Sequence, residues 1–196
     1  AALSRVYPAL AASPPRQAPT AEAVAPLTAH LLTHPGRTWE VEGPLGELTA
    51  AFLEPLALVQ RQGDQWRLSV ATCEVAEEIM ARLRRRDQTP ETEPGRPLGY
   101  PDLARALAKS AWGLPPELCE LVVAALIRAG ALLPVNAARE IVPRNELQSP
   151  LAEHVAALSR SPLLDTTAWS NLTRLSRVLL ERMVPRPDHA LQAEIW

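Results

Sequence analysis

Residues 98–142 constrain the fold of this chain most strongly, because helix-breaking residues divide them into short units of definite length. Pro101 is typical of the first turn of a helix, and the sequence WGLP at 112–115 is typical of a turn. Pro116 favours the start of a second helix, which Gly130 would end. The apolar residues after Gly130 predict a strand and a weak hairpin. The expected order is therefore helix, turn, helix and hairpin.

The whole chain is predicted to be mainly α with small β-hairpins, in the α+β class. Thr20 can cap a helix that reaches about His34, and the alternating residues on both sides of 62–64 predict a hairpin. The polar, Pro-rich sequence QTPETEPGRP at 88–97 reads as a linker. We predict five segments: a Pro- and Ala-rich arm (1–19), a helix-plus-hairpin domain (20–87), the linker (88–97), a central domain (98–147) and a C-terminal helical region (148–196).

The C-terminal region is expected to form a helical hairpin. Ser149 can cap a helix, and Pro150 is favoured at the first helical position, so a helix is predicted to start here. A second helix would run from about Asp165 to Val184. The chain lacks an initiator Met and stops at Trp196 within a helical pattern. We therefore expect it to be a fragment of a longer polypeptide.

The central segment resembles the winged-helix superfamily. The resemblance rests on the LxRAGxL sequence at 126–132, in which Gly130 allows a left-handed helix end before the chain enters a sheet. It covers residues 98–142, and residues 24–86 are a candidate for a second, degenerate copy. The resemblance implies a winged helix-turn-helix fold and contact with nucleic acid or with another protein.

A DNA-reading domain of this class places the start of its second helix in the major groove. In this chain the start of that helix, residues 115–120, contains Glu117 and Glu120 and none of the side chains that hydrogen-bond purines well. Its apolar residues also surround more than half of the helix, which predicts a protein partner, either the region after 148 or another subunit. The predicted partner-binding residues are Leu118, Glu120, Val123 and Ile127.

Nucleic acid remains an alternative partner. The formal net charge of −2 provides no global attraction to a polyanion. A few phosphate contacts are still conceivable, although Glu140 and Glu146 lie among the residues concerned. The candidate nucleic-acid contacts are Arg105, Lys109, Asn136, Arg139 and Arg144.

No other group of residues indicates a catalytic or metal-binding site. His30 and His34 have helical spacing but no third metal ligand, so we expect no metal and no cofactor. The basic run at 84–86 follows three glutamates and indicates a solvated helix end rather than a nucleic-acid patch. Cys73 and Cys119 read as buried, reduced thiols, which favours a cytoplasmic protein. No apolar run could span a membrane, so no membrane partner is expected.

The leading hypothesis is a non-catalytic winged-helix interaction module that docks protein partners. The 20 Pro residues and the dominance of arginine over lysine suggest a high-GC bacterial genome. The layout also weakly resembles the winged-helix segments of large ATPases in bacterial phage-defence systems, so the module would belong to a larger protein such as a multidomain ATPase. Two alternatives stay open: a DNA-binding transcriptional regulator, and an accessory part of an enzyme whose active site lies outside these residues.

Overall fold

The first of two structural units combines helices with a three-stranded sheet. The computed structural model describes residues 18–34, 37–87, 97–162, 168–171 and 174. The Thr20 side chain accepts a hydrogen bond from the Ala23 amide at 3.3 Å, so the predicted cap is confirmed. The elements of this unit are α3 (Ala21–Thr33), β1 (Thr38–Glu40), α4 (Gly43–Leu48), the π-helix η1 (Thr49–Leu53), β2 (Val59–Gln62) and β3 (Gln65–Leu68).

The second unit contains the helix pair that the sequence predicts. Gly130 has a φ of +72°, the left-handed conformation expected of a residue that ends a helix. After a short 3-10 turn, η2 (Val70–Thr72), the elements are α5 (Glu74–Asp87), β4 (Leu98–Gly99), α6 (Tyr100–Lys109), α7 (Pro116–Arg128), β5 (Leu132–Val135), two more 3-10 turns, η3 (Arg144–Glu146) and η4 (Leu151–Glu153), and β6 (Ala157–Arg160).

The two sheets share one strand order. In the first, β3 lies between β1 and β2, and in the second, β6 lies between β4 and β5. All four pairings are antiparallel, with Trp39 opposite Trp66 in the first sheet and Pro134 opposite Leu158 in the second. In both units, therefore, the last strand along the chain becomes the central strand.

The region from 148 to 162 corrects one expectation. Ser149 and Pro150 do not begin an α-helix; the chain makes the 3-10 turn η4 and then the strand β6. The reason is that β4 and β5 both hydrogen-bond to β6, so these residues complete the sheet. The rest of the predicted C-terminal hairpin lies outside the described residues, apart from a helical turn at 168–171.

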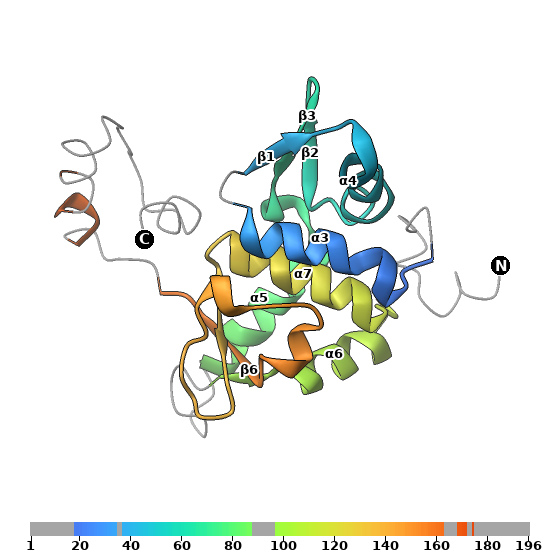
Figure 1. Cartoon of the computed structure of the whole chain (residues 1–196). Coiled ribbons are helices and arrows are strands. Elements are labelled where there is room, and N and C mark those ends of the chain that lie inside the picture. Colours follow the sequence, from blue (N-terminus) through green and yellow to red (C-terminus); the bar gives the residue numbers. More distant parts are fainter. Residues whose placement is uncertain (1–17, 35–36, 88–96, 163–167, 172–173, 175–196) are drawn as a thin grey trace.

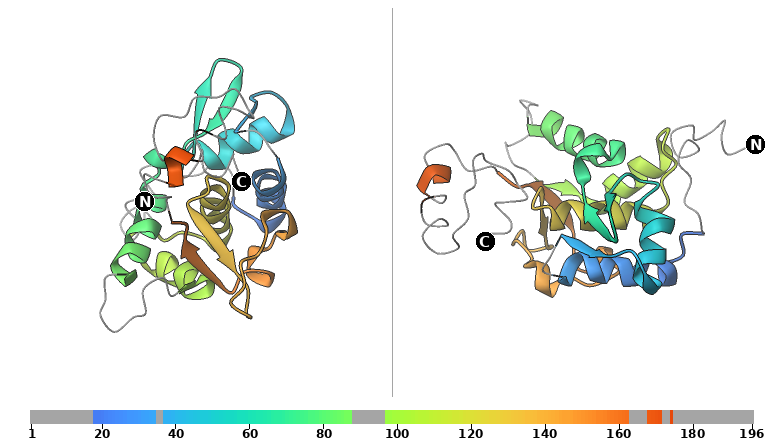
Figure 2. Two further views of the ribbon diagram at one scale, coloured as in Figure 1. Left: turned by 90° about the vertical axis from the view of Figure 1, so that its left-hand side faces the viewer. Right: turned by 90° about the horizontal axis from the view of Figure 1, so that it is seen from above.

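Helices α3 and α7 lie side by side across the middle of the molecule (Figures 1 and 2). In Figure 1 the first sheet and α4 lie above this pair, and α5, α6 and β6 lie below it. One hydrophobic core joins buried residues of both units, from Val24 to Leu158. The mixed α+β class is thus confirmed. None of the helices in the described ranges is long and apolar enough to cross a bilayer.

Candidate interaction surfaces

The predicted partner-binding residues of α7 lie in the interior of the chain. Leu118 and Val123 have no exposed surface, and Ile127 is 6% exposed. The element that packs most extensively on α7 is α3, which comes from the other unit rather than from the region after 148 or another subunit. The apolar surface of α7 is therefore covered by α3 of the same chain.

Glu120, the fourth of these residues, is 8% exposed and holds a segment of the loop before β6. Its Oε1 accepts a hydrogen bond from the Ser149 hydroxyl at 2.6 Å, and its Oε2 accepts one from the Leu151 amide at 3.2 Å. A buried carboxylate needs such donors because burial removes its hydration. This side chain joins α7 to η4, and both of its oxygens are engaged.

Arg128, at the end of α7, makes the corresponding link to α3. Its guanidinium donates to the backbone carbonyls of Leu31 and His34, at the C-terminal end of α3. The cation thus meets the negative end of the helix dipole. Burial, followed by the nearby charges of Arg144 and Arg37, lowers the pKa of Arg128 to about 10, so the side chain stays charged at neutral pH.

The candidate nucleic-acid contacts are distributed over three elements. Arg105 and Lys109 lie on α6, where Arg105 pairs with Asp102 at 3.0 Å. Asn136 and Arg139 lie in the turn after β5, and Asn136 is hydrogen-bonded to Glu140. The last of the five, Arg144, belongs to η3, which packs on α3. Lys109 and Arg139 are exposed.

His30 on α3 and His34, the residue that follows α3, lie against one another with tilted rings. The ring centroids of His30 and His34 are 4.4 Å apart, and the His30 ring meets Trp39 edge-on at 5.0 Å. Burial chiefly, and then the charges of His34 and Arg128, lower the pKa of His30 to about 4. Within the described part of the chain, no cluster of three potential ligands could hold a metal ion.

Both cysteines are reduced and buried, as predicted. Burial, with a further contribution from Glu120, raises the pKa of the Cys119 thiol to about 12. Burial also raises the pKa of Cys73, whose sulfur accepts a hydrogen bond from the Ala76 amide. The nucleophilic form of cysteine is the thiolate, so these protonated thiols act as small core residues.

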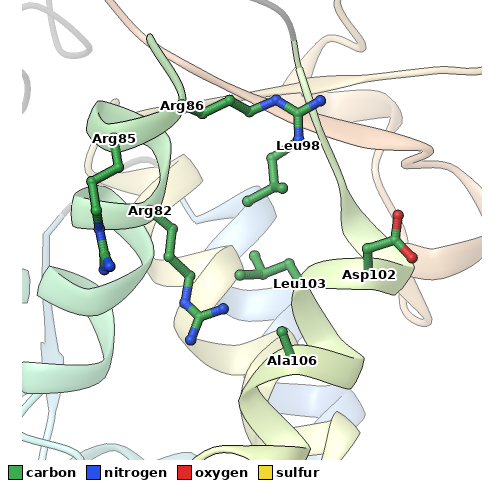
Figure 3. A pocket seen from close by; sticks show the side chains of 7 residues that line it. All are labelled: Arg82, Arg85, Arg86, Leu98, Asp102, Leu103 and Ala106. Carbon is green, nitrogen blue, oxygen red and sulfur yellow. The ribbon is translucent and has the colours of Figure 1, made fainter. Parts of the chain in front are cut away.

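A hollow of about 410 Å³ opens between α5 and α6, and we call it the arginine hollow (Figure 3). In Figure 3 the side chains of Arg82 and Arg86 extend from α5 beside the apolar side chains of β4 and α6. The residues that line it are Arg82, Arg85, Arg86, Leu98, Asp102, Leu103 and Ala106.

A second hollow, of about 470 Å³, lies where the N-terminal ends of α3, α6 and α7 meet the chain around Pro150. Its walls are mostly apolar, and Glu22, Glu117 and Glu120 contribute carboxylates. Tyr100 also lines it, with 4% of its surface exposed. Burial is the main reason that the pKa of the Tyr100 hydroxyl is raised, so this group stays protonated.

Sequence reasoning did not identify the arginine hollow. It placed the basic run on a solvated helix end, and Arg84 does pair with Glu77 there. The hollow depends on Leu98 and Leu103, which follow in the chain after the predicted linker. No local pattern indicates that these residues lie beside α5.

Comparisons with models of known families, with curated proteins and with solved structures found no match for this chain.

Proposed function

We propose that residues 74–160 form a winged-helix domain and that residues 21–68 form a reduced second copy. The support is the shared plan of helix, strand, helical segment and two further strands, with the last strand in the centre of each sheet. The first unit has one helical segment, α4 with η1, where the second has the pair α6 and α7. The LxRAGxL sequence at the end of α7 supports the same assignment.

We further propose that the protein is a non-catalytic module that docks protein partners. The observation that carries this proposal is the pair of hollows with apolar walls, and the cover of α3 over α7 argues against the DNA-binding alternative. A helix that reads bases must present its N-terminal side chains to the major groove. In α7, Leu118 is fully buried and Glu120 is engaged by Ser149 and Leu151, so neither side chain is free to meet DNA.

The surface that remains favours protein over a polyanion. Two hollows with apolar walls open on it, and concave, mostly apolar sites are typical of ligand and peptide binding. Ile141, at the end of the turn after β5, is the large apolar residue that the described ranges leave most exposed, at 60%. The basic residues of this turn and of α6 are few, and Arg105 on α6 is paired with Asp102.

A titration of the full chain with labelled DNA duplexes of random sequence at physiological salt tests the proposal. We expect no binding tighter than about 10⁻⁵ M, a value within the range of non-specific association. Nanomolar, sequence-dependent binding that weakens in R139M would instead establish the DNA-binding alternative through the turn after β5. R61M, which changes an exposed arginine of β2, is the matched control for loss of one positive charge.

A further inference from the structure

The arginines of the arginine hollow differ in how far their charges are already satisfied. Arg82 pairs with Glu78 at 2.7 Å, and Arg85 approaches the same carboxylate at 3.3 Å. Arg86 makes no hydrogen bond or ion pair within the described part of the chain, and its Nε is buried without an acceptor. The described residues therefore supply no carboxylate that pairs with the charge of Arg86, whereas Arg82 and Arg85 share Glu78.

The surroundings of Arg86 restrict what that acceptor can belong to. The hollow has an apolar wall of Leu98, Leu103 and Ala106, and in Figure 3 the Arg86 side chain extends toward Leu98. Asp102, the one carboxylate of the lining, already pairs with Arg105. The hollow thus offers a partner one guanidinium that the described residues leave unpaired, that of Arg86, and an apolar wall.

We propose that the arginine hollow binds an acidic segment of a partner protein, in which a carboxylate lies next to a large apolar side chain. The planar guanidinium of Arg86 would hold the carboxylate through paired N–H donors, and the apolar side chain would cover Leu98, Leu103 and Ala106. This inference rests on the proposed function, since it names the chemistry of the partner that the module docks.

A protein segment fits this hollow better than a nucleic acid does. A duplex presents a phosphate at each nucleotide, whereas two of the three arginines of the hollow, Arg82 and Arg85, are already paired with Glu78. A phosphate backbone also gains nothing from an apolar wall, whereas a buried apolar side chain contributes about 1.5–3 kcal/mol in general. A volume of about 410 Å³ lies within the usual range for a small binding site.

Selection from a random peptide library displayed on phage, with the full chain as target, tests this inference. We expect the enriched peptides to share one or two acidic residues beside a Leu, Ile, Met or aromatic residue. A synthetic peptide of that consensus should bind R86M at least about tenfold more weakly, because a charge-assisted pair is lost. R61M, on an exposed part of β2, should bind as the unchanged chain does.

A second variant separates the shape of the hollow from its charge. A106L adds side-chain volume to the hollow without changing any charge. We expect it also to weaken binding of the consensus peptide at least about tenfold. Circular dichroism and thermal unfolding of each variant establish that it is folded. The inference is overturned if no acidic-apolar consensus emerges, or if R86M and A106L bind the selected peptide normally.

The outcomes distinguish this inference from the proposed function. If the duplex titration shows no binding and the library gives no such consensus, the inference fails and the docking proposal stands. If a short DNA duplex binds at nanomolar concentration and R86M abolishes that binding, the hollow is a nucleic-acid site and both proposals fail.

Discussion

The guanidinium of Arg128 lies 3.0 Å from the backbone carbonyl oxygen of Leu31, a hydrogen bond that joins α7 to α3. The same side chain also donates to the carbonyl of His34. It thus supplies donors to carbonyl groups at the C-terminal end of α3, where the helix itself offers none. This contact fixes the helix that covers α7.

Removal of the Arg128 charge is therefore expected to destabilise the whole fold. In R128M the buried carbonyl of Leu31 and the partly buried carbonyl of His34 lose a charged donor, and the unfolding free energy should fall by about 2–3 kcal/mol. Urea unfolding followed by tryptophan fluorescence measures the change. R105M removes an exposed arginine paired with Asp102, and it should change stability by less than about 0.5 kcal/mol. Equal effects of the two variants would contradict the role given to Arg128.

Glu120 and Ser149 should prove energetically coupled. E120A leaves the buried Leu151 amide without an acceptor, and we expect a loss of about 3 kcal/mol, against about 1 kcal/mol for S149A. The double variant should lose less than the sum of the two single losses by about 1 kcal/mol. The exposed Glu153 supplies the control, E153A, and additive losses at 120 and 149 would rule out the coupling.

The lowered pKa of His30 predicts acid sensitivity. In the unfolded chain this imidazole takes up a proton near pH 6.5, whereas in the folded chain it does so only near pH 4. Unfolding therefore binds a proton between these values, and His30 lowers stability as the pH falls through this window. The carboxylates titrate in the lower part of the same range, so the unchanged chain must be compared with H30L. Between pH 7.5 and pH 5, H30L should lose roughly 1 kcal/mol less than the unchanged chain does. Parallel losses in the two proteins would show that His30 does not titrate as described.

Gly46 should reverse the usual effect of replacing a helical glycine by alanine. A Cβ at this position would lie 1.8 Å from the Val41 carbonyl oxygen, because α4 passes directly over the end of β1. Alanine normally stabilises a helix by about 1 kcal/mol relative to glycine. We expect G46A instead to destabilise the chain by about 2 kcal/mol or more in thermal unfolding, because the backbone must shift. E47A, on the exposed neighbour, should have little effect.

The sequence predicts the local elements of this fold well. Pro116 and Gly130 mark the two ends of α7, and Gly63, with a φ of +65°, lies in the turn of the first hairpin. These residues act through backbone conformation, which depends on neighbours in the chain. The same local signals identify Thr20 as the residue before α3.

Contacts between distant parts of the chain could not be predicted in this way. The spacing of Leu151, Val155 and Leu158 fits a helix, yet Leu158 lies in β6 because two other strands require a partner there. Likewise, the apolar surface of α7 predicts that something covers it, but nothing in its sequence specifies α3. The arginine hollow was missed for the same reason, since α5 and α6 meet only in the folded chain.

The hydrogen bond between Arg128 and Leu31 joins residues 97 positions apart. During synthesis, α3 leaves the ribosome well before the helix that shields it exists. Until α7 has been synthesised, the apolar side chains of α3 stay exposed to water or bound to a chaperone. Three of them, Val24, Leu27 and Leu31, are buried in the folded protein. The order of translation thus leaves the first half of this protein with an uncovered apolar helix, and the second half completes it.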